Sequence, residues 1–266
     1  MFKRQCKFTI TKEIISQGGQ AIIHEGITSK GTPIAVKVFP HKNSNNEAFQ
    51  RELNILKRLH GKNKICQPLG AVTEANYSAV AYEKYDSDLY QYLFEENRVL
   101  SKMDILKLFK RVCCAVAQMH DEKIAHLDIK PENILLRRKS MAVVLCDFGM
   151  SYVENSGKLP CRGTPEYMAP EVSKKNNYCP FSADIYSLGV LLHVMLAGYF
   201  PSFDPQTGTL VVPREFMLDE DVHFLLLAML NPVPEKRPTI HHILASNVFK
   251  GSRKSSVNRV LKHLFS

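Results

Sequence analysis

The chain has 266 residues, of which 45% are hydrophobic and 23% are charged. This composition is typical of a globular protein with a sizeable core, and it excludes a disordered or collagen-like chain. The formal net charge of +9 would suit an anionic partner such as nucleic acid or acidic lipid. However, Lys and Arg are spread along the chain rather than gathered in blocks, which favours a solubilising surface.

Cysteine usage and the apolar segments indicate the compartment. The seven cysteines form no CxxC pair, so neither a zinc site nor a disulfide framework is expected. Residues 1–6 lack the apolar core of a signal peptide. The most apolar stretch, Tyr186 to Phe200, is short for a bilayer and predicts a buried helix. We therefore expect an intracellular protein of the cytoplasm, the nucleus or both, with no transmembrane segment.

The first eighty or so residues are predicted to be rich in strands, because short β-type runs alternate with glycine-containing turns. The expected strands are Phe8–Ile10, Ala21–Ile23, Pro33–Phe39, Ile65–Val72 and Tyr77–Tyr82. Between the third and fourth of these, from about Asn46 to His60, the apolar period becomes that of a helix. Its apolar face carries Phe49, Leu53, Leu56 and Leu59.

Beyond residue 88 the apolar pattern is mostly helical. A polar connection is expected at Lys84–Asp88. The expected helices are Leu89–Phe94, Met103–His120, Ala183–Leu196 and Glu220–Leu230. The sequence therefore predicts an α+β fold in which a small sheet-rich part joins a larger, mainly helical part.

Four short motifs follow one another along the chain. They are Ile34–Lys37 (IAVK), His126–Asn133 (HLDIKPEN), Asp147–Gly149 (DFG) and Ala169–Glu171 (APE). Any one of them occurs by chance, but this order and these separations are specific for phosphoryl transfer from ATP. The chain resembles the eukaryotic protein kinases, and the resemblance covers nearly all of it.

The resemblance implies a bilobal kinase fold over residues 1–266. An N-lobe at 1–83, a hinge at 84–88, a mainly helical C-lobe at 89–249 and a C-terminal tail at 250–266 are expected. The implied reaction is transfer of the γ-phosphoryl group of ATP, with Mg²⁺, to Ser or Thr hydroxyls of protein substrates. A lysine at position 130, two residues after Asp128, is typical of the serine/threonine branch.

Catalytic roles are implied residue by residue. Asp128 would be the base for the substrate hydroxyl, and Lys130 would neutralise charge on the γ-phosphate. Asn133 and Asp147 would bind Mg²⁺ through hard oxygen atoms. Lys37 would hold the α- and β-phosphates.

The partner of Lys37 is expected on the helix predicted from about 46 to 60. Glu52 is preferred because it lies in a segment resembling helix C of the family. Glu47, about a turn and a half earlier, is the alternative.

The nucleotide site is sketched by the same resemblance. Its expected residues are Ile15, Ser16, Gly18, Gly19, Ala21, Ile23, Ala35, Lys37, Glu83, Tyr85 and Leu135. Tyr82 is expected at the gatekeeper position before the hinge. The family's Gly-x-Gly-x-x-Gly loop is altered, since Ser16 and Ala21 replace the outer glycines. Because added Cβ atoms restrict the approach of backbone N–H groups to phosphates, a pseudokinase that binds nucleotide without turnover is the alternative.

A second departure from the family is Leu127, which stands where regulated kinases carry an arginine. Leucine cannot pair with a phosphate on the activation loop. We therefore hypothesise a non-RD kinase whose activity does not depend on phosphorylation at Ser151, Tyr152 or Ser156. The His-Leu-Asp form also occurs in branches of the calmodulin-dependent kinase group. It therefore suggests that this chain is related to that group.

Further segments resemble the peptide-docking apparatus of protein kinases and argue against small-molecule kinases. Gly163–Glu171 resembles the end of the activation segment, and Asp184–Gly189 resembles the start of the buried helix F. Arg237 is expected to be the buried partner of Glu171. Asp88 and Glu132 resemble acidic positions that recognise basic residues in substrates.

The segment Lys250–Ser266 is basic, and its apolar residues recur at helical spacing. It predicts an amphipathic helix. Packing on the C-lobe, binding of a regulatory partner such as calmodulin, and contact with an anionic membrane all remain open. No motif supports nucleic-acid binding.

Overall fold

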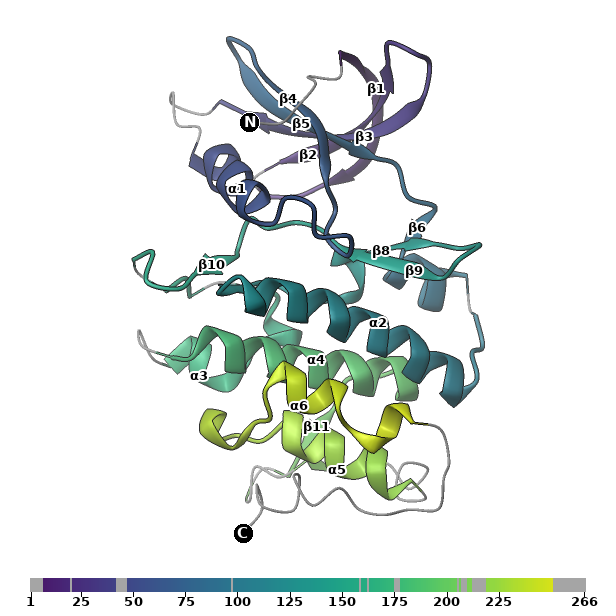
Figure 1. Ribbon diagram of the computed structural model, residues 1–266, viewed down its shortest axis with the longest axis vertical. Coiled ribbons are helices and arrows are strands. Elements are labelled where there is room, and N and C mark those ends of the chain that lie inside the picture. Colours follow the sequence, from purple (N-terminus) through teal and green to yellow (C-terminus); the bar gives the residue numbers. More distant parts are fainter. Residues whose placement is uncertain are drawn as a thin grey trace. The chain divides into compact units, whose positions relative to one another are not determined.

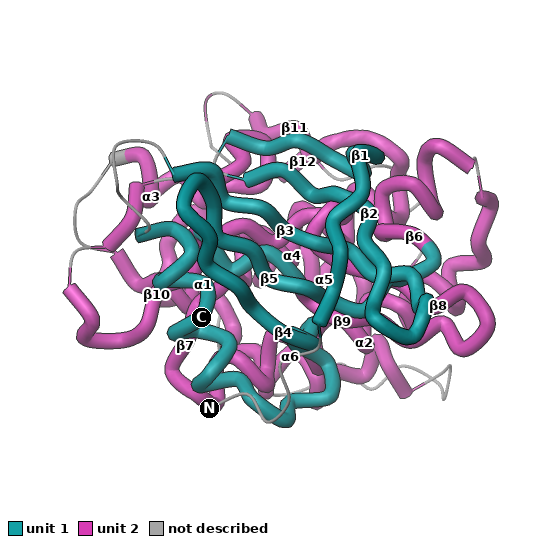
Figure 2. Tube along the Cα trace, turned by 90° about the horizontal axis from the view of Figure 1, so that it is seen from above, with its two compact units in different colours: residues 1–86, 146–149 teal, residues 87–145, 150–266 magenta. Residues whose placement is uncertain are grey.

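The computed structural model describes residues 7–19, 21–41, 47–96, 98–157, 159–161, 163–174, 178–204, 206, 210–211 and 219–250. The chain divides into two compact units, which Figure 2 colours separately. Unit 1 comprises residues 1–86 and 146–149, and unit 2 comprises residues 87–145 and 150–266. The short segment that contains the DFG triplet thus belongs to the same unit as the N-terminal strands.

Unit 1 is built on a five-stranded antiparallel sheet with the order β1-β2-β3-β5-β4. Its strands are β1 (Phe8–Gln17), β2 (Ile22–Thr28), β3 (Pro33–Pro40), β4 (Pro68–Thr73) and β5 (Tyr77–Glu83). A buried cluster on one side of the sheet contains Ile34, Val36, Ala79 and Ala81. Because side chains alternate along a strand, Lys37 faces the other side.

Helix α1 (Glu47–Arg58) covers the side of the sheet that carries Lys37 (Figure 1). The Phe49 ring meets the Phe39 ring edge-on, with 5.7 Å between ring centroids. An acidic residue in the first turn and basic residues in the last turn complement the helix dipole. The helix predicted between residues 46 and 60 is therefore confirmed.

Three strands of unit 1 differ in extent from the prediction. Strand β2 runs to Thr28, whereas it was expected to end at Ile23. Strand β1 continues to Gln17 through register shifts, whereas only its first three residues were expected. Strand β4 begins at Pro68 rather than Ile65. The Gln67 amide donates hydrogen bonds to backbone carbonyls of residues 59, 62 and 65, so this segment closes the turn after α1 instead of joining the sheet.

Unit 2 is mainly helical. Its helices are α2 (Lys102–Asp121), α3 (Pro170–Lys174), α4 (Pro180–Ala197), α5 (Glu220–Met229) and α6 (Ile240–Leu244). A π-helical turn at Gln91–Glu95 lies within the predicted helix 89–94. Ser101 caps α2 by accepting a hydrogen bond from the Asp104 amide, and Asp219 caps α5 in the same way.

Helix α4 is long and apolar enough to cross a membrane by length and composition alone. However, 72% of it is buried inside the structure, as for the core helix of a globular unit. It ends at Gly198, whose φ of +80° lies in the left-handed region that terminates helices. The predicted buried helix is confirmed, although Tyr199 and Phe200 at its expected end are exposed.

Short strands in unit 2 went unpredicted. They are β6 (Ser87–Asp88), β7 (Ile124–Ala125), β8 (Ile134–Arg137), β9 (Ala142–Leu145), β10 (Tyr152–Val153), β11 (Ser202–Phe203) and β12 (Leu210–Val211). Segments of two to four residues carry too little periodicity to be recognised. Two of these features matter for the site. Strand β8 begins directly after Asn133, and β10 pairs with β7, which ends just before His126.

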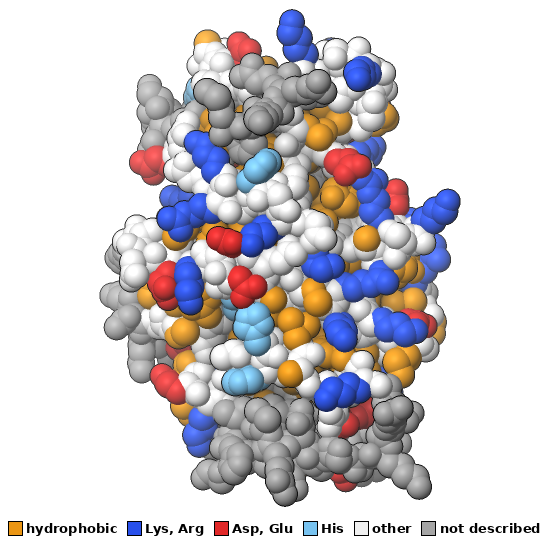
Figure 3. Space-filling view, viewed as in Figure 1, with side chains coloured by type: hydrophobic (Ala, Val, Ile, Leu, Met, Phe, Trp, Pro, Cys, Tyr) orange, Lys and Arg blue, Asp and Glu red, His pale blue; other side chains and the backbone are white. Residues whose placement is uncertain are grey.

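The α+β class is confirmed. On the face shown in Figure 3, Lys and Arg side chains lie at many separate places, with acidic side chains between several of them. This distribution agrees with the spread of basic residues along the sequence.

Candidate active site

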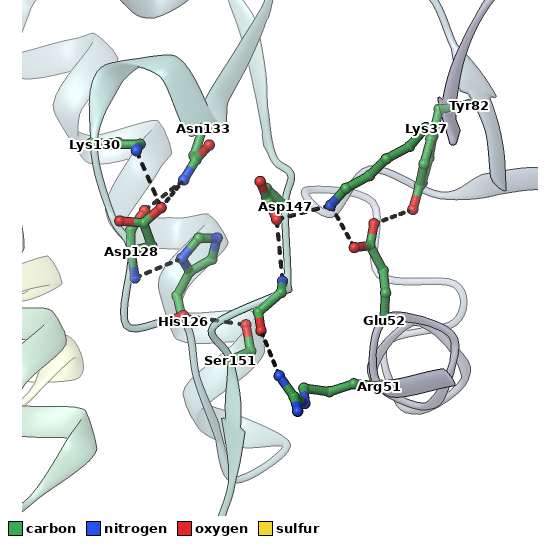
Figure 4. A network of polar contacts seen from close by, with 11 residues as sticks. Lys37, Arg51, Glu52, Tyr82, His126, Asp128, Lys130, Asn133, Asp147 and Ser151 are labelled. Atoms are coloured by element: carbon green, nitrogen blue, oxygen red, sulfur yellow. Dashed lines mark hydrogen bonds and ion pairs between the residues drawn. The ribbon is translucent and has the colours of Figure 1, made fainter. Parts of the chain in front are cut away.

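Lys37 on β3 bonds to two carboxylates of unit 1 (Figure 4). Its Nζ lies 2.5 Å from Glu52 Oε2 and 2.9 Å from Asp147 Oδ1. Burial by itself lowers the pKa of Lys37, but the charges of the two carboxylates and their hydrogen bonds outweigh burial and raise the pKa above its ordinary value. Lys37 therefore remains a cation at neutral pH.

The two candidate partners of Lys37 lie differently on α1. Glu52 faces the sheet and is 1% exposed, whereas Glu47 begins the helix and is exposed. The structure thus brings Glu52, and not Glu47, to Lys37. The neighbouring Arg51 donates from Nη1 to the Gly149 carbonyl at 3.3 Å, so α1 is also bonded to the end of the DFG triplet.

Asp147 adopts a left-handed backbone conformation with φ of +60°. Such a conformation is uncommon for a residue other than glycine, and aspartate tolerates it better than most. The Gly149 amide donates to Asp147 Oδ1 at 3.2 Å, which orients the carboxylate, while Phe148 between them is fully buried. The Asp147 side chain is 47% exposed, so a carboxylate with a fixed orientation remains accessible.

Nine of the residues predicted around the nucleotide, besides Lys37, also belong to unit 1. The exposed ones are Ile15, Ser16, Gly18, Gly19 and Glu83, the partly buried ones are Ile23, Ala35 and Tyr85, and Ala21 is buried. Because Ile23 pairs with Lys37 across the strands, and Ala35 lies two residues before Lys37, these side chains share one side of the sheet. Leu135, the remaining predicted contact, lies on β8 in unit 2 and is partly buried.

Gly18 and Gly19, the glycines of the altered loop, are not required by the packing of the protein. A Cβ added at Gly18 would lie 3.6 Å from the Ala21 carbonyl oxygen, an ordinary contact, and at Gly19 it would meet nothing within 4 Å. Neither glycine adopts a positive φ. Neither the packing nor the backbone conformation of the protein therefore requires a glycine at these two positions.

Asp128 in unit 2 is the acceptor at the centre of a second polar group. Asn133 Nδ2 donates to Asp128 Oδ2 at 2.9 Å, and Lys130 Nζ lies 3.3 Å from the same oxygen. The hydroxyl of Thr164 donates to Asp128 Oδ1 at 2.7 Å and its amide donates at 3.1 Å. Lys130 also bonds to Thr164 Oγ1 at 2.7 Å, which closes the group.

Asn133 ends the 3-10 turn Pro131–Asn133, which folds it back onto Asp128. Its Nδ2 also donates to the Asp128 carbonyl at 2.8 Å, and Figure 4 shows its oxygen pointing away from Asp128. An amide oxygen is the type of hard ligand that Mg²⁺ prefers, and the same holds for the carboxylate of Asp147, which belongs to unit 1. Among the described residues, no group of three or more His, Cys, Asp or Glu is placed to hold a metal ion.

Asp184 on α4 holds the backbone that carries Asp128, a role that sequence reasoning missed. It is fully buried, and its carboxylate accepts from the amides of His126 and Leu127 at 2.8 Å each. His120 Nε2 lies 2.9 Å from the same carboxylate. These bonds stabilise Leu127 in a left-handed conformation with φ of +63°. Asp184 was recognised within a helical motif, but nothing in that motif reveals its partners.

The start of the activation segment is held by backbone pairing. Strand β10 pairs Tyr152 with Ala125. The buried Ser151 donates to the His126 carbonyl at 3.3 Å. Leu127 is itself buried at 8% exposure. Of Ser151, Tyr152 and Ser156, whose phosphorylation we expect activity not to need, only Ser156 is exposed.

The predicted pair between Glu171 and Arg237 is confirmed. Arg237 Nη1 and Nη2 donate to the two Glu171 oxygens at 2.5 and 2.9 Å, in a buried bidentate arrangement. The guanidinium also lies 4.9 Å from the centre of the Tyr186 ring. Burial raises the pKa of Tyr186, although the charge of Arg237 opposes this rise.

Residues 9–249 match the model of the protein kinase domain, so the chain belongs to the protein kinase family. A protein kinase domain-containing protein of Schizosaccharomyces pombe is 37% identical over 168 residues, which cover 62% of this chain and 31% of that protein. CBL-interacting protein kinase 32 of Oryza sativa subsp. japonica is 31% identical over 245 residues, 85% of this chain and 55% of the relative.

Calcium/calmodulin-dependent protein kinase type 1 of Caenorhabditis briggsae is 29% identical over 231 residues, covering 78% of this chain and 61% of that kinase. The chain thus spans less than two thirds of the length of each of these relatives. The name of this last relative agrees with the predicted affinity with calmodulin-dependent kinases. The predicted C-terminal amphipathic helix lies outside the described residues, apart from Lys250.

Proposed function

We propose that the chain is a serine/threonine protein kinase that transfers the γ-phosphoryl group of ATP to protein substrates. One observation carries the proposal: each unit gathers three of the six polar side chains that the reaction needs. These are Lys37, Glu52 and Asp147 in unit 1, and Asp128, Lys130 and Asn133 in unit 2. Phosphoryl transfer depends on positioning and charge compensation, which is what two such pre-bonded groups supply.

In this proposal Asp128 accepts the proton of the substrate hydroxyl as that oxygen attacks the γ-phosphorus, and the bond from the γ-phosphorus to the β,γ-bridging oxygen breaks to release ADP. Hydrogen bonds from Asn133 and Thr164 hold its carboxylate in one orientation. Lys130 places a positive charge beside the same carboxylate, where it compensates negative charge on the transferred group. Lys37, kept protonated by its two carboxylates, orients the α- and β-phosphates.

The proposed cofactor is Mg²⁺, for which Asn133 and Asp147 would each offer a side-chain oxygen as ligand. When bound, the ion neutralises phosphate charge. The proposed adenine contacts are Ile15, Ile23, Ala35 and Leu135, with backbone groups of Glu83 to Tyr85 at the hinge and the backbone of residues 16–21 over the phosphates.

The deciding experiment measures incorporation of labelled phosphate from ATP and Mg²⁺ into a generic basic protein. Asp128→Asn and Lys37→Met should each lose about 100-fold or more, because each removes a group that acts on the reacting atoms. Asp121→Asn and Lys107→Met are the matched controls, since both alter exposed charges on α2 and should leave the rate unchanged.

Absence of turnover in the unmodified chain, with ATP still raising its melting temperature, would favour the pseudokinase alternative. The observation behind that alternative is the replacement of two loop glycines by Ser16 and Ala21. Equal activity in the Asp128→Asn variant would contradict the proposed base.

We also propose that the kinase is of the non-RD type and needs no phosphate on its activation segment. The supporting observations are the buried, uncharged Leu127 and the pairing of β10 with β7, which orders residues 152–153 through backbone hydrogen bonds. Phosphatase-treated protein and the Ser156→Ala variant should keep full activity. Loss of activity on phosphatase treatment, restored by phosphorylation of Ser156, would contradict this proposal.

For substrates we propose a preference for basic residues near the target hydroxyl. Glu132 supports it better than Asp88, because Glu132 is exposed whereas Asp88 accepts a hydrogen bond from the Gln91 amide at 2.8 Å. Burial raises the pKa of Asp88, although hydrogen bonds from backbone amides oppose this rise. On a peptide array, Glu132→Gln should reduce selection for Arg and Lys more than Asp88→Asn does.

A regulatory partner at residues 250–266 and an intracellular location remain proposals as well. The basic, amphipathic pattern of the tail supports the first. The six cysteines in the described part of the chain form no disulfide with one another, which supports a reducing compartment. Calorimetric titration of the full chain with calcium-loaded calmodulin tests the partner, and a fluorescent fusion tests the location.

A further inference from the structure

Tyr82 makes a contact that its expected place beside the hinge does not account for. It lies on β5 and is 8% exposed, and its hydroxyl donates to Glu52 Oε1 at 2.6 Å (Figure 4). Lys37 Nζ donates to the other oxygen, Oε2, at 2.5 Å. Each oxygen of the buried Glu52 carboxylate therefore has a donor from a different strand.

The strand register brings these donors together. Ala35 pairs with Tyr82 and Lys37 pairs with Val80, so Tyr82 and Lys37 lie on the same side of neighbouring strands. The side chain of Glu52 extends from α1 to this same side of the sheet. Two polar bonds thus tie the helix to the sheet, in addition to the apolar contact between Phe39 and Phe49.

The bond from Tyr82 limits the rotation of the Glu52 carboxylate that the bond from Lys37 alone would permit. A carboxylate held only by a lysine can rotate about its terminal bond and exchange its two oxygens. With Oε1 held by Tyr82, Oε2 faces Lys37, and Lys37 can bond Asp147 Oδ1 at the same time. Burial and the adjacent charge of Glu52 raise the pKa of Tyr82 well above its ordinary value, so its hydroxyl remains a donor.

We propose that Tyr82 is a positioning residue for phosphoryl transfer, whose hydroxyl orients Glu52 so that Lys37 is held for the phosphates of ATP. This inference rests on the proposed kinase function. It concerns the hydroxyl alone, because the ring of a phenylalanine would fill the same space without donating to the carboxylate.

The first test compares Tyr82→Phe with Tyr77→Phe. Tyr77 lies on the same strand but packs against the cluster on the opposite side of the sheet, so it is a matched loss of one hydroxyl. We expect Tyr82→Phe to lower kcat about tenfold and to change the KM for ATP by less than about twofold. That split marks a lost contribution to the transition state. Values of kcat equal to those of the unmodified chain and Tyr77→Phe would overturn the proposal.

The second test asks whether Tyr82 acts through Glu52. In a Glu52→Met background the side chain has no acceptor left, so adding Tyr82→Phe should change the residual rate by less than about twofold. A tenfold loss in both backgrounds would overturn the proposal, because Tyr82 would then act without Glu52.

A third measurement needs no turnover. Hydrogen exchange should speed up in the amides of α1 in Tyr82→Phe and stay unchanged in α4, which belongs to the other unit. If the unmodified chain proves inactive, the proposed function fails, and this measurement still judges the contact. Unchanged exchange in α1 would overturn the inferred role of the hydroxyl.

Discussion

Each unit contains a buried ion pair, and the two pairs are built differently. In unit 2, every nitrogen of the Arg237 guanidinium is used: Nη1 and Nη2 bind Glu171, Nε donates to the Asn231 carbonyl at 2.8 Å, and Nη1 also donates to the Ser182 carbonyl at 3.0 Å. In unit 1, the Lys37 cation is shared between the buried Glu52 and the half-exposed Asp147.

This difference indicates different uses of buried charge. A buried pair in which all three guanidinium nitrogens are bonded within the protein contributes to the folded state rather than to the binding of a ligand. A cation shared with an accessible carboxylate can exchange that contact for another anion at little cost. We therefore expect substitutions in the unit 2 pair to change stability, and substitutions in the unit 1 pair to change activity.

The largest change in stability is expected for Glu171→Gln. It leaves a buried guanidinium without its counter-charge, which typically costs about 3–5 kcal/mol of the free energy of unfolding. Denaturant titration measures this loss. The joint change of Glu171 and Arg237 to methionine should cost less than either single change, and a loss below about 1 kcal/mol for Glu171→Gln would contradict the comparison.

Lys37→Met should show the opposite pattern. We expect kcat/KM for ATP to fall about 100-fold or more, equivalent to about 2.7 kcal/mol of activation free energy. The free energy of unfolding should fall by less than it does in Glu171→Gln, because Glu52 loses its buried counter-charge but keeps its bond to Tyr82. Denaturant titration beside steady-state kinetics provides the check, and a stability loss as large as that of Glu171→Gln would break the distinction.

Asp184→Asn sharpens the comparison, because it changes a buried carboxylate that binds the backbone just before Asp128. Only one oxygen would remain for the amides of His126 and Leu127, and the new amide group would face a donor. We expect about 1.5–3 kcal/mol of lost stability together with a lower kcat, since hydrogen bonds to charged groups have this magnitude. Full activity in the folded Asp184→Asn protein would show that Asp128 does not depend on this support.

The smallest expected effect concerns the pH dependence of Cys146, which directly precedes Asp147. Burial, with the nearby Cys66 and Asp147, raises the pKa of the Cys146 thiol well above its ordinary value. A raised pKa keeps the thiol protonated at pH 7, so alkylation should be slow there and should accelerate as the pH rises. Mass spectrometry after iodoacetamide treatment at pH 7 and pH 9 checks this. Cys161, which is exposed, is the comparison within the same chain and should react faster than Cys146 at pH 7.

Long amphipathic elements were predictable because their apolar period repeats several times. Helices α1, α2 and α5 agree with the predicted ranges to within a few residues. Strand β4 was predicted too early, because the amide of Gln67 makes tertiary hydrogen bonds that an apolar run does not encode. The two-residue pairing of β7 with β10 was invisible for the same reason, since both strands exist only because a distant segment lies beside them.

In the candidate site too, local groupings of residues were predictable from the sequence and contacts between distant residues were not. Asp128, Lys130 and Asn133 lie within six consecutive residues, so their motif indicated their proximity and, together with the three other motifs, the family. Contacts of Glu52 with Tyr82, of Thr164 with Asp128 and of Asp184 with the loop amides join residues 30, 36 and 57 or 58 positions apart. Residue types and local spacing determine which groups the chain can offer, because local geometry follows from neighbouring residues. Which distant donor meets which acceptor was decided only by the packing of strands and helices, because no local pattern records contacts made across that distance.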